Sequence, residues 1–202
     1  MAMTNLAVIF YSSTGTITRI AREMARAAQA EGAEVRLRKV AELAPQEAID
    51  SVPGWAENLE RTADIPPATP DDMVWADAVI FGTPTRFGNV ASQLKQFIDT
   101  LGGLQAQGLL AGKVYSGFTS TATPHGGHES TLLALGNTFH HFGGVIVPPG
   151  YTDAAHGNPY GTSHFTGNGT VPVGEPTLAA ARAQATRVAR FAAAIRSVRF
   201  AA

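Results

Sequence analysis

The stretch LAVIFYSSTGTITRIAREMARAAQAEG, residues 6–32, contains the signals of a strand, a loop and a helix in succession. Leu6 to Tyr11 is a continuous apolar run rich in branched and aromatic residues, which is typical of a strand covered on both faces of a parallel sheet. From Thr16 onward apolar side chains recur every three or four residues, and Gly32 supplies a stop signal. The stretch therefore predicts the first strand and helix of an α/β fold.

The same alternation of strand and helix continues along the chain. Short apolar runs and helical periodicity predict further strands at 34–38, 78–81, 113–118 and 145–147, and helices at 93–101, 129–142 and 177–198. Five strands that alternate with helices are typical of a doubly wound α/β fold, in which helices cover both faces of a five-stranded parallel sheet. We expect a single domain over residues 1–202, with long loops at 41–72 and 148–176 that bind ligands or contact other subunits.

The composition restricts the function and the location of the protein. The 202 residues carry a net charge of -1, which argues against a main function in binding nucleic acid. Without cysteine, the chain can form neither a disulfide nor a thiolate metal site. It contains no apolar run of the roughly 18 to 20 residues that span a bilayer, and no basic segment followed by an apolar leader. We therefore expect a cytoplasmic protein without a membrane span.

The loop after the first predicted strand has the features of a phosphate site. It offers hydroxyl groups, backbone N–H groups made accessible by a glycine, and the positive end of a helix, through Ser12, Ser13, Thr14, Gly15, Thr16 and Ile17. The nucleotide-binding patterns GxxxxGK[ST] and GxGxxG are both absent. By itself, the loop is equally consistent with a hydroxyl-rich helix cap.

Two further loops should lie beside this one, because the carboxyl ends of parallel strands meet at one edge of the sheet. The loop after the 78–81 strand supplies a cation and an aromatic ring through Thr85, Arg86 and Phe87. The loop after the 113–118 strand is small and hydroxylated, with Ser120, Thr121, Ala122, Thr123, Pro124 and His125. Together they suggest a ligand with one phosphate and one planar ring, such as FMN. In the alternative interpretation, Arg86 pairs with a surface carboxylate and Phe87 closes the core.

Several longer segments occur in a recognisable order: PTRFGN (84–89), QLKQFIDTLGGL (93–104), STATPHGG (120–127), HHFGGVIVPPGY (140–151) and PYGTSHFTGNGT (159–170). They resemble the successive signatures of the WrbA-type NAD(P)H:quinone oxidoreductases, also called tryptophan-repressor-binding proteins, over nearly the whole chain. The resemblance implies a flavodoxin-like fold, an FMN cofactor and a homotetramer. It implies two-electron reduction of quinones to hydroquinones by NADH or NADPH, in a ping-pong hydride transfer carried out by the flavin.

The resemblance also assigns roles to single residues. It places the FMN phosphate on Ser12 to Ile17, and the ring contacts on Thr85 to Phe87 and on Ser120 to His125. His141, rather than His140, matches a histidine near the ring edge and is the candidate for a proton relay; no other catalytic side chain is assigned. Thr14 and Gln105 stand where many members of the family carry an aromatic residue and a tryptophan that contact nicotinamide or quinone. They are therefore the candidate substrate-binding residues, and the substrate preference is left open.

Two other functions fit the sequence less well. A one-electron carrier of the flavodoxin type is disfavoured because carriers tend to be strongly acidic, and a regulatory module that binds a repressor lacks a recognition motif. The six histidines do not have the HExxH spacing of a metal site, so we expect no metal. Tyr160 and His164 lie in the second long loop and are equally consistent with a neighbouring subunit's active site and with an ordered surface loop.

Overall fold

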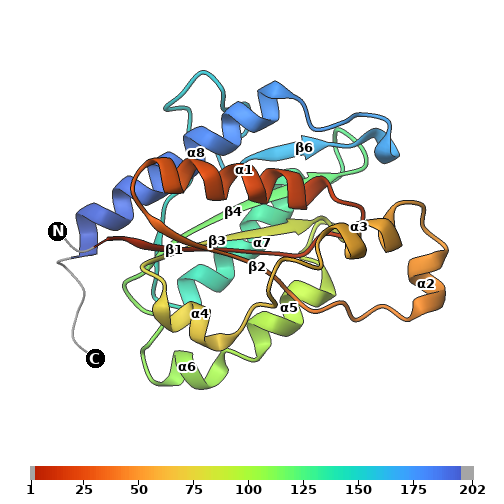
Figure 1. Cartoon of the computed structure of the whole chain (residues 1–202). Helices are drawn as coiled ribbons and strands as arrows, with labels where there is room; N and C mark the ends of the chain where they lie inside the picture. The colour runs from red at the N-terminus through yellow and green to blue at the C-terminus, as the bar shows by residue number, and fades with distance from the viewer. Residues whose placement is uncertain (1–2, 197–202) are drawn as a thin grey trace.

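The computed structural model describes residues 3–196 and contains a parallel sheet between two layers of helices (Figure 1). The order of the five predicted strands is β2-β1-β3-β4-β5, and every neighbouring pair is parallel. Their bounds are β1 (Asn5–Phe10), β2 (Glu34–Lys39), β3 (Ala78–Pro84), β4 (Val114–Thr121) and β5 (Val145–Ile146). The prediction of a doubly wound five-stranded sheet is confirmed.

Helices cover both faces of this sheet. On one face lie α1 (Thr16–Ala30) and α8 (Glu175–Ile195), and on the other lie α4 (Pro70–Trp75), α5 (Ser92–Asp99), α6 (Gly102–Ala106) and α7 (His128–His141) (Figure 1). Along β1, Leu6 and Val8 pack in the cluster with α1 and α8, whereas Ala7 and Ile9 pack in the cluster with α5 and α7. Both faces of β1 are buried, which explains its uninterrupted apolar sequence. The predicted last helix begins two residues earlier than expected, and positions 197–198 lie outside the described residues.

Contrary to the expectation, the first long loop, residues 41–72, is not a loop throughout, because it contains two short helices and the start of a third. These are α2 (Gln46–Asp50), α3 (Trp55–Arg61) and the start of α4. Two prolines of this segment stand where helices begin: Pro45 is the N-cap of α2, and Pro70 is the first residue of α4. Proline is tolerated there because the first N–H groups of a helix have no intrahelical partner.

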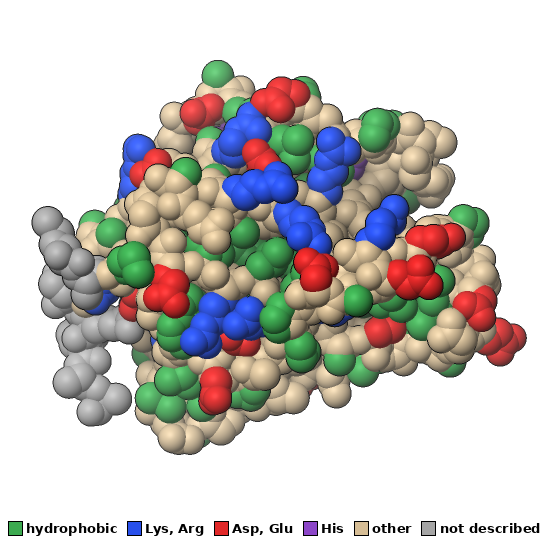
Figure 2. All heavy atoms as spheres, viewed as in Figure 1, with side chains coloured by type: hydrophobic (Ala, Val, Ile, Leu, Met, Phe, Trp, Pro, Cys, Tyr) green, Lys and Arg blue, Asp and Glu red, His purple; other side chains and the backbone are tan. Residues whose placement is uncertain are grey.

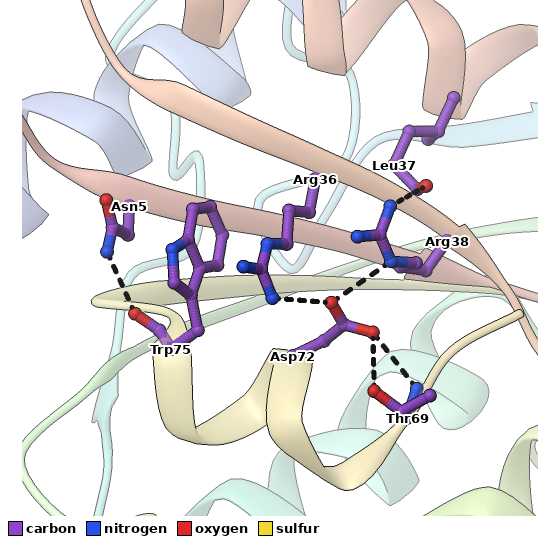
Figure 3. Close-up of polar contacts among 7 residues, drawn as sticks. All are labelled: Asn5, Arg36, Leu37, Arg38, Thr69, Asp72 and Trp75. Atoms are coloured by element: carbon purple, nitrogen blue, oxygen red, sulfur yellow. Dashed lines mark hydrogen bonds and ion pairs between the residues drawn. The ribbon is translucent and has the colours of Figure 1, made fainter. Parts of the chain in front are cut away.

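A charged cluster fixes α4 against the edge strand β2 (Figure 3). The Asp72 carboxylate accepts hydrogen bonds from Arg36 at 3.1 Å and Arg38 at 3.0 Å, and also from the backbone and hydroxyl of Thr69. Burial raises the pKa of Asp72, but the hydrogen bonds from Thr69 and the two arginines outweigh it and lower the pKa overall. The Arg36 guanidinium also stacks on the Trp75 ring, 4.1 Å from its centroid.

The second long loop contains a strand that the sequence did not predict. β6 (Ser163–Phe165) pairs in parallel with the end of β4, from Thr119 to Thr121, and is followed by the short 3-10 helix η1 (Gly167–Gly169). β5 pairs only with Val114 and Tyr115 and leaves this end of β4 open, so that β6 can complete the edge. A strand of three residues is too short to give a periodic pattern. No helix in the described part of the chain is long and apolar enough to cross a membrane.

Candidate functional site

The loop after β1 wraps over the start of α1. The Ser12 hydroxyl accepts hydrogen bonds from the backbone N–H groups of Gly15 at 3.2 Å and Thr18 at 3.3 Å. Gly15 is the N-cap of α1 and has a φ of 102°, a conformation that glycine adopts without steric cost. The local sequence therefore forms a closed turn at the positive end of the helix.

Several backbone donors in this turn are unused. The N–H groups of Ser13, Thr14, Thr16 and Ile17 have no acceptor among residues 3–196, and the first turn of α1 has no acidic residue. Unpaired N–H groups at a helix N-terminus form an anion site, since the groups and the helix dipole both favour negative charge. The surrounding serine and threonine hydroxyls add further donors. The loop is thus suited to a phosphate group.

Asn58 of α3 anchors this turn and was missed by the sequence analysis. Its side chain is buried, and its Nδ2 atom donates a hydrogen bond of 2.9 Å to the carbonyl oxygen of Ser12. Its Oδ1 atom lies only 3.1 Å from the position that a Cβ atom on Gly15 would take. A side chain at position 15 would therefore meet both an unfavourable φ and a close contact. No sequence pattern connects Asn58 to Ser12, because an isolated polar residue has no periodicity.

The second loop is a strained turn that presents an aromatic ring to solvent. Arg86 and Asn89 exchange two backbone hydrogen bonds of 2.8 and 3.0 Å around Phe87 and Gly88. Both central residues have positive φ, 53° for Phe87 and 75° for Gly88, as in a type I′ turn. The left-handed conformation costs a residue other than glycine about 1–2 kcal/mol, and Phe87 is fully exposed. The alternative that Phe87 closes the core is therefore wrong, and strain of this kind is common at functional sites.

Arg86 in the same turn makes no ion pair with any residue of the described chain. Its guanidinium donates a hydrogen bond of 3.0 Å to the carbonyl of Thr85. The alternative that it pairs with a surface carboxylate is contradicted. Thr85 in turn receives hydrogen bonds on its hydroxyl from the Gly88 N–H and the Thr131 hydroxyl, so the base of the turn is held firmly.

The third loop lies beside the second. The N–H of Thr85 donates a hydrogen bond of 2.8 Å to the carbonyl of Ser120, at the end of β4. The next residue, Thr121, contacts His128 Nε2 at 2.6 Å through its hydroxyl, and its carbonyl accepts the Thr166 N–H at 2.8 Å. Thr166, which follows β6, thereby reaches the site. No periodic pattern predicts this residue, because its position depends on the pairing of β6 with β4.

These three loops and Thr166 enclose a cavity of about 180 Å³. Its lining consists of Ser12, Ser13, Thr14, Thr16, Ile17, Pro84, Thr85, Arg86, Ser120, Thr121, Ala122 and Thr166. The tertiary structure thus brings together most of the predicted cofactor residues and adds Pro84 and Thr166. All of the others except His141 lie on the same loops without lining the cavity: Gly15, Phe87, Thr123, Pro124 and His125.

His141 and Gln105 lie elsewhere in the chain. His141 ends α7, whose 14 residues span about 20 Å from the loops at its start. The Gln105 side chain of α6 approaches the His141 carbonyl at 3.5 Å, and both residues line a shallow hollow with α5. The assignments of His141 to the flavin and of Gln105 to the substrate stay predictions.

Tyr160 and His164 of the second long loop do not line the cavity. His164 is buried, with ring nitrogens 3.0 Å from the Thr177 hydroxyl and 3.0 Å from the Val171 carbonyl, so it holds the loop together. Tyr160 is exposed on the same loop. Within residues 3–196, no group of three His, Asp or Glu side chains is arranged to hold a metal ion.

A half-buried carboxylate behind the phosphate loop, Glu42, was not predicted from the sequence. Glu42 accepts hydrogen bonds from the Tyr11 hydroxyl at 2.9 Å, the Trp55 indole at 2.9 Å and the Gln93 amide at 2.8 Å. Burial raises the pKa of Glu42, but these bonds and the Ala44 N–H lower it overall. Burial and the Glu42 charge raise the pKa of Tyr11, so Tyr11 remains a neutral phenol next to Ser12.

Comparison with known proteins agrees with this geometry. Residues 5–158 match the family described as NADPH-dependent FMN reductase. The NAD(P)H dehydrogenase (quinone) of Deinococcus radiodurans is 50% identical over 190 residues, covering 92% of this chain and 94% of that protein. The protein of the same name from Geotalea uraniireducens is 42% identical over 196 residues, covering 92% and 96%.

Solved structures show the same fold. The flavodoxin, WrbA-like protein from Agrobacterium tumefaciens superposes with a TM-score of 0.67 at 25% identity, covering 95% of this chain and 98% of that one. A flavodoxin from the domain Archaea gives a TM-score of 0.63 at 12% identity, covering 94% and 99%, which is a likeness of fold alone. With its flavodoxin-like sheet and its match over most of the chain, this protein belongs to the NADPH-dependent FMN reductase family.

Proposed function

We propose that the protein is an FMN-dependent NAD(P)H:quinone oxidoreductase. The net reaction is NAD(P)H + H⁺ + quinone → NAD(P)⁺ + hydroquinone, in which the quinone gains two electrons and two protons. The observation that carries the proposal is the cavity in which unused N–H groups of the Ser12–Ile17 loop face two further loops. Relatives named NAD(P)H dehydrogenase (quinone), at 42–50% identity, support the same reaction.

The residues present fit FMN. Four N–H groups without acceptors and a helix N-terminus suit its phosphate, and Ser12 to Ile17 would hold that group. Thr85 to Phe87 and Ser120 to Ala122 would hold the ring system, because the two loops are joined by a backbone hydrogen bond and flank the same cavity. When bound, FMN supplies the hydride acceptor and the two-electron donor.

The protein itself binds the cofactor and the substrates and orients them. Arg86 makes no ion pair with any described residue, and it lines the cavity. Its positive charge would favour a reduced, anionic ligand there. Phe87 supplies an exposed aromatic face on a turn that is held rigidly by Thr85. Among residues 3–196, no carboxylate and no histidine lines the cavity, so we assign no acid or base from it. His141 stays the candidate for proton delivery.

We infer a ping-pong order, in which the nicotinamide and the quinone use the same side of the cavity in turn. Double-reciprocal plots at several quinone concentrations should then give parallel lines, whereas intersecting lines would indicate a ternary complex. A homotetramer in the cytoplasm also remains a prediction, and light scattering of the purified protein would measure the oligomeric state. Thr14, which lines the cavity, and Gln105, which lines the hollow beside α5, remain the candidate substrate contacts.

The first experiment is a visible spectrum of protein reconstituted with FMN, followed without oxygen by NADH or NADPH and then by benzoquinone. The proposal requires flavin binding, bleaching by a nicotinamide and recovery with the quinone. Binding without reduction by either nicotinamide would favour a one-electron carrier. A failure to bind FMN would overturn the proposal and leave a regulatory binding module as the next candidate.

A further inference from the structure

The proposed phosphate site lacks a cation in its own loop. Ser12 to Ile17 contain no lysine or arginine, and Arg86 enters the cavity from the second loop. A phosphate monoester carries a charge of about -1.5 to -2 at pH 7. Hydroxyl and N–H groups can bind it, but a nearby positive charge would bind it more tightly.

Arg61, the last residue of α3, lies beside the phosphate loop. Its Nη2 atom is 3.7 Å from the position that a Cβ atom on Gly15 would take. Asn58 stands one turn earlier on the same face of α3 and binds the Ser12 carbonyl. The bond from Asn58 therefore fixes the helix that carries Arg61 against the loop.

The Arg61 guanidinium has no hydrogen bond or ion pair with any residue between 3 and 196. Glu57 stands four residues earlier in α3, a spacing that permits a helical ion pair, yet none forms. Figure 2 shows Lys and Arg side chains gathered over α1 and α8 and toward α3, with acidic side chains among them. Arg26, for example, pairs with Glu23 at 3.4 Å.

This arrangement is unfavourable without an anion. The positive end of α1 has no acidic residue in its first turn, and Arg19 of that turn is also unpaired within the described chain. Cations near a helix N-terminus are destabilised by the helix dipole. An anion bound to the free N–H groups would relieve this repulsion and would interact favourably with Arg61.

We propose that Arg61 is the counter-charge for the FMN phosphate, acting across the N-terminus of α1. The inference rests on the proposed function, and it makes α3 part of the cofactor site. Because the charge acts on the phosphate rather than on the ring, Arg61 sets the preference for FMN over riboflavin, which has the same ring without phosphate.

The test is a fluorescence titration of the cofactor-free protein with FMN and with riboflavin. Arg61→Gln should raise the Kd for FMN about two- to fivefold, the range for an exposed charge pair, and leave the Kd for riboflavin unchanged. The loss should be largest near about 0.01 M salt and disappear near about 1 M, where charges are screened within a few ångströms. Arg61→Lys should restore most of the affinity.

Arg26→Gln is the matched control, because it removes the same charge from the exposed side of α1, about three turns beyond the N-terminus of that helix. It should leave both affinities unchanged. If Arg61→Gln weakens FMN and riboflavin equally, Arg61 only supports the fold and the inference is overturned. If FMN binds the variant as tightly as the unmodified protein, Arg61 is not the counter-charge, although the proposed function stands. If the unmodified protein binds no FMN, the proposed function itself fails.

Discussion

Replacement of Glu42 by glutamine tests whether a half-buried carboxylate supports the phosphate loop. One carboxylate oxygen accepts from the Gln93 amide and the backbone of residues 43–44, and the other accepts from the Tyr11 hydroxyl and the Trp55 indole. Glutamine can retain the first set of bonds with its carbonyl oxygen. Its amide NH₂ would then face the Trp55 N–H, so that one charged hydrogen bond is lost and two donors oppose each other.

The expected loss of stability follows from these contacts. A hydrogen bond to a charged group contributes about 1.5–3 kcal/mol, and an unsatisfied buried donor costs about 1–3 kcal/mol. Glu42 is partly exposed and water can reach the indole, so we take the lower part of this range. We expect Glu42→Gln to lower the free energy of unfolding by about 2 kcal/mol at pH 7.

The loss should depend on pH with a defined sign. The pKa of Glu42 lies below its ordinary value of 4.5 in the folded protein. The carboxylate therefore contributes stability that is fully present above about pH 4.5 and is lost as the pH falls through the folded pKa. The variant has no such group. The difference between the two proteins should consequently shrink below about pH 4, even though other carboxyl groups titrate in both.

Urea unfolding of the cofactor-free protein, followed by tryptophan fluorescence at several pH values, measures this difference. Glu47→Gln is a suitable control, since Glu47 is exposed on α2 and its side chain makes no hydrogen bond or ion pair in the described chain. It should change stability by less than about 0.5 kcal/mol. A loss for Glu42→Gln no larger than this, or a loss that is independent of pH, would refute the reasoning.

Three further predictions concern the site and its support. Gln184 is buried, accepts the Thr162 N–H at 2.7 Å and donates to the Ser116 hydroxyl and the Gly117 carbonyl at 2.8 Å. Gln184→Leu should therefore lower the free energy of unfolding by about 2–4 kcal/mol, measured by urea unfolding; a change below about 1 kcal/mol would contradict this. Phe87→Gly should relieve the strained φ and keep stability within about 1 kcal/mol, while quinone turnover falls; unchanged turnover would remove the ring from the site. Arg86→Ala should weaken FMN retention or turnover, and unchanged behaviour in both assays would exclude Arg86 from the site.

The sequence by itself determined the layered architecture. The run from Leu6 to Tyr11 is apolar at every position because both faces of β1 are covered, and this local pattern predicts a central parallel strand. In the same way, helical periodicity predicts the helices that cover the two faces of the sheet. The three loops could be assigned to one site because parallel strands place their carboxyl ends at the same edge. These inferences depend on periodicity and on chain order, both of which the sequence contains.

Only the tertiary structure decided which other residues reach the site. Asn58 and Glu42 are single polar residues whose partners lie 46 and up to 51 positions away, so no local pattern predicts their contacts. Thr166 reaches the cavity because β6 completes an edge that β5 leaves open. The exposure of Phe87 depends on a strained turn that composition does not encode. Such contacts arise when distant segments pack, and packing is a property of the whole fold rather than of any stretch within it.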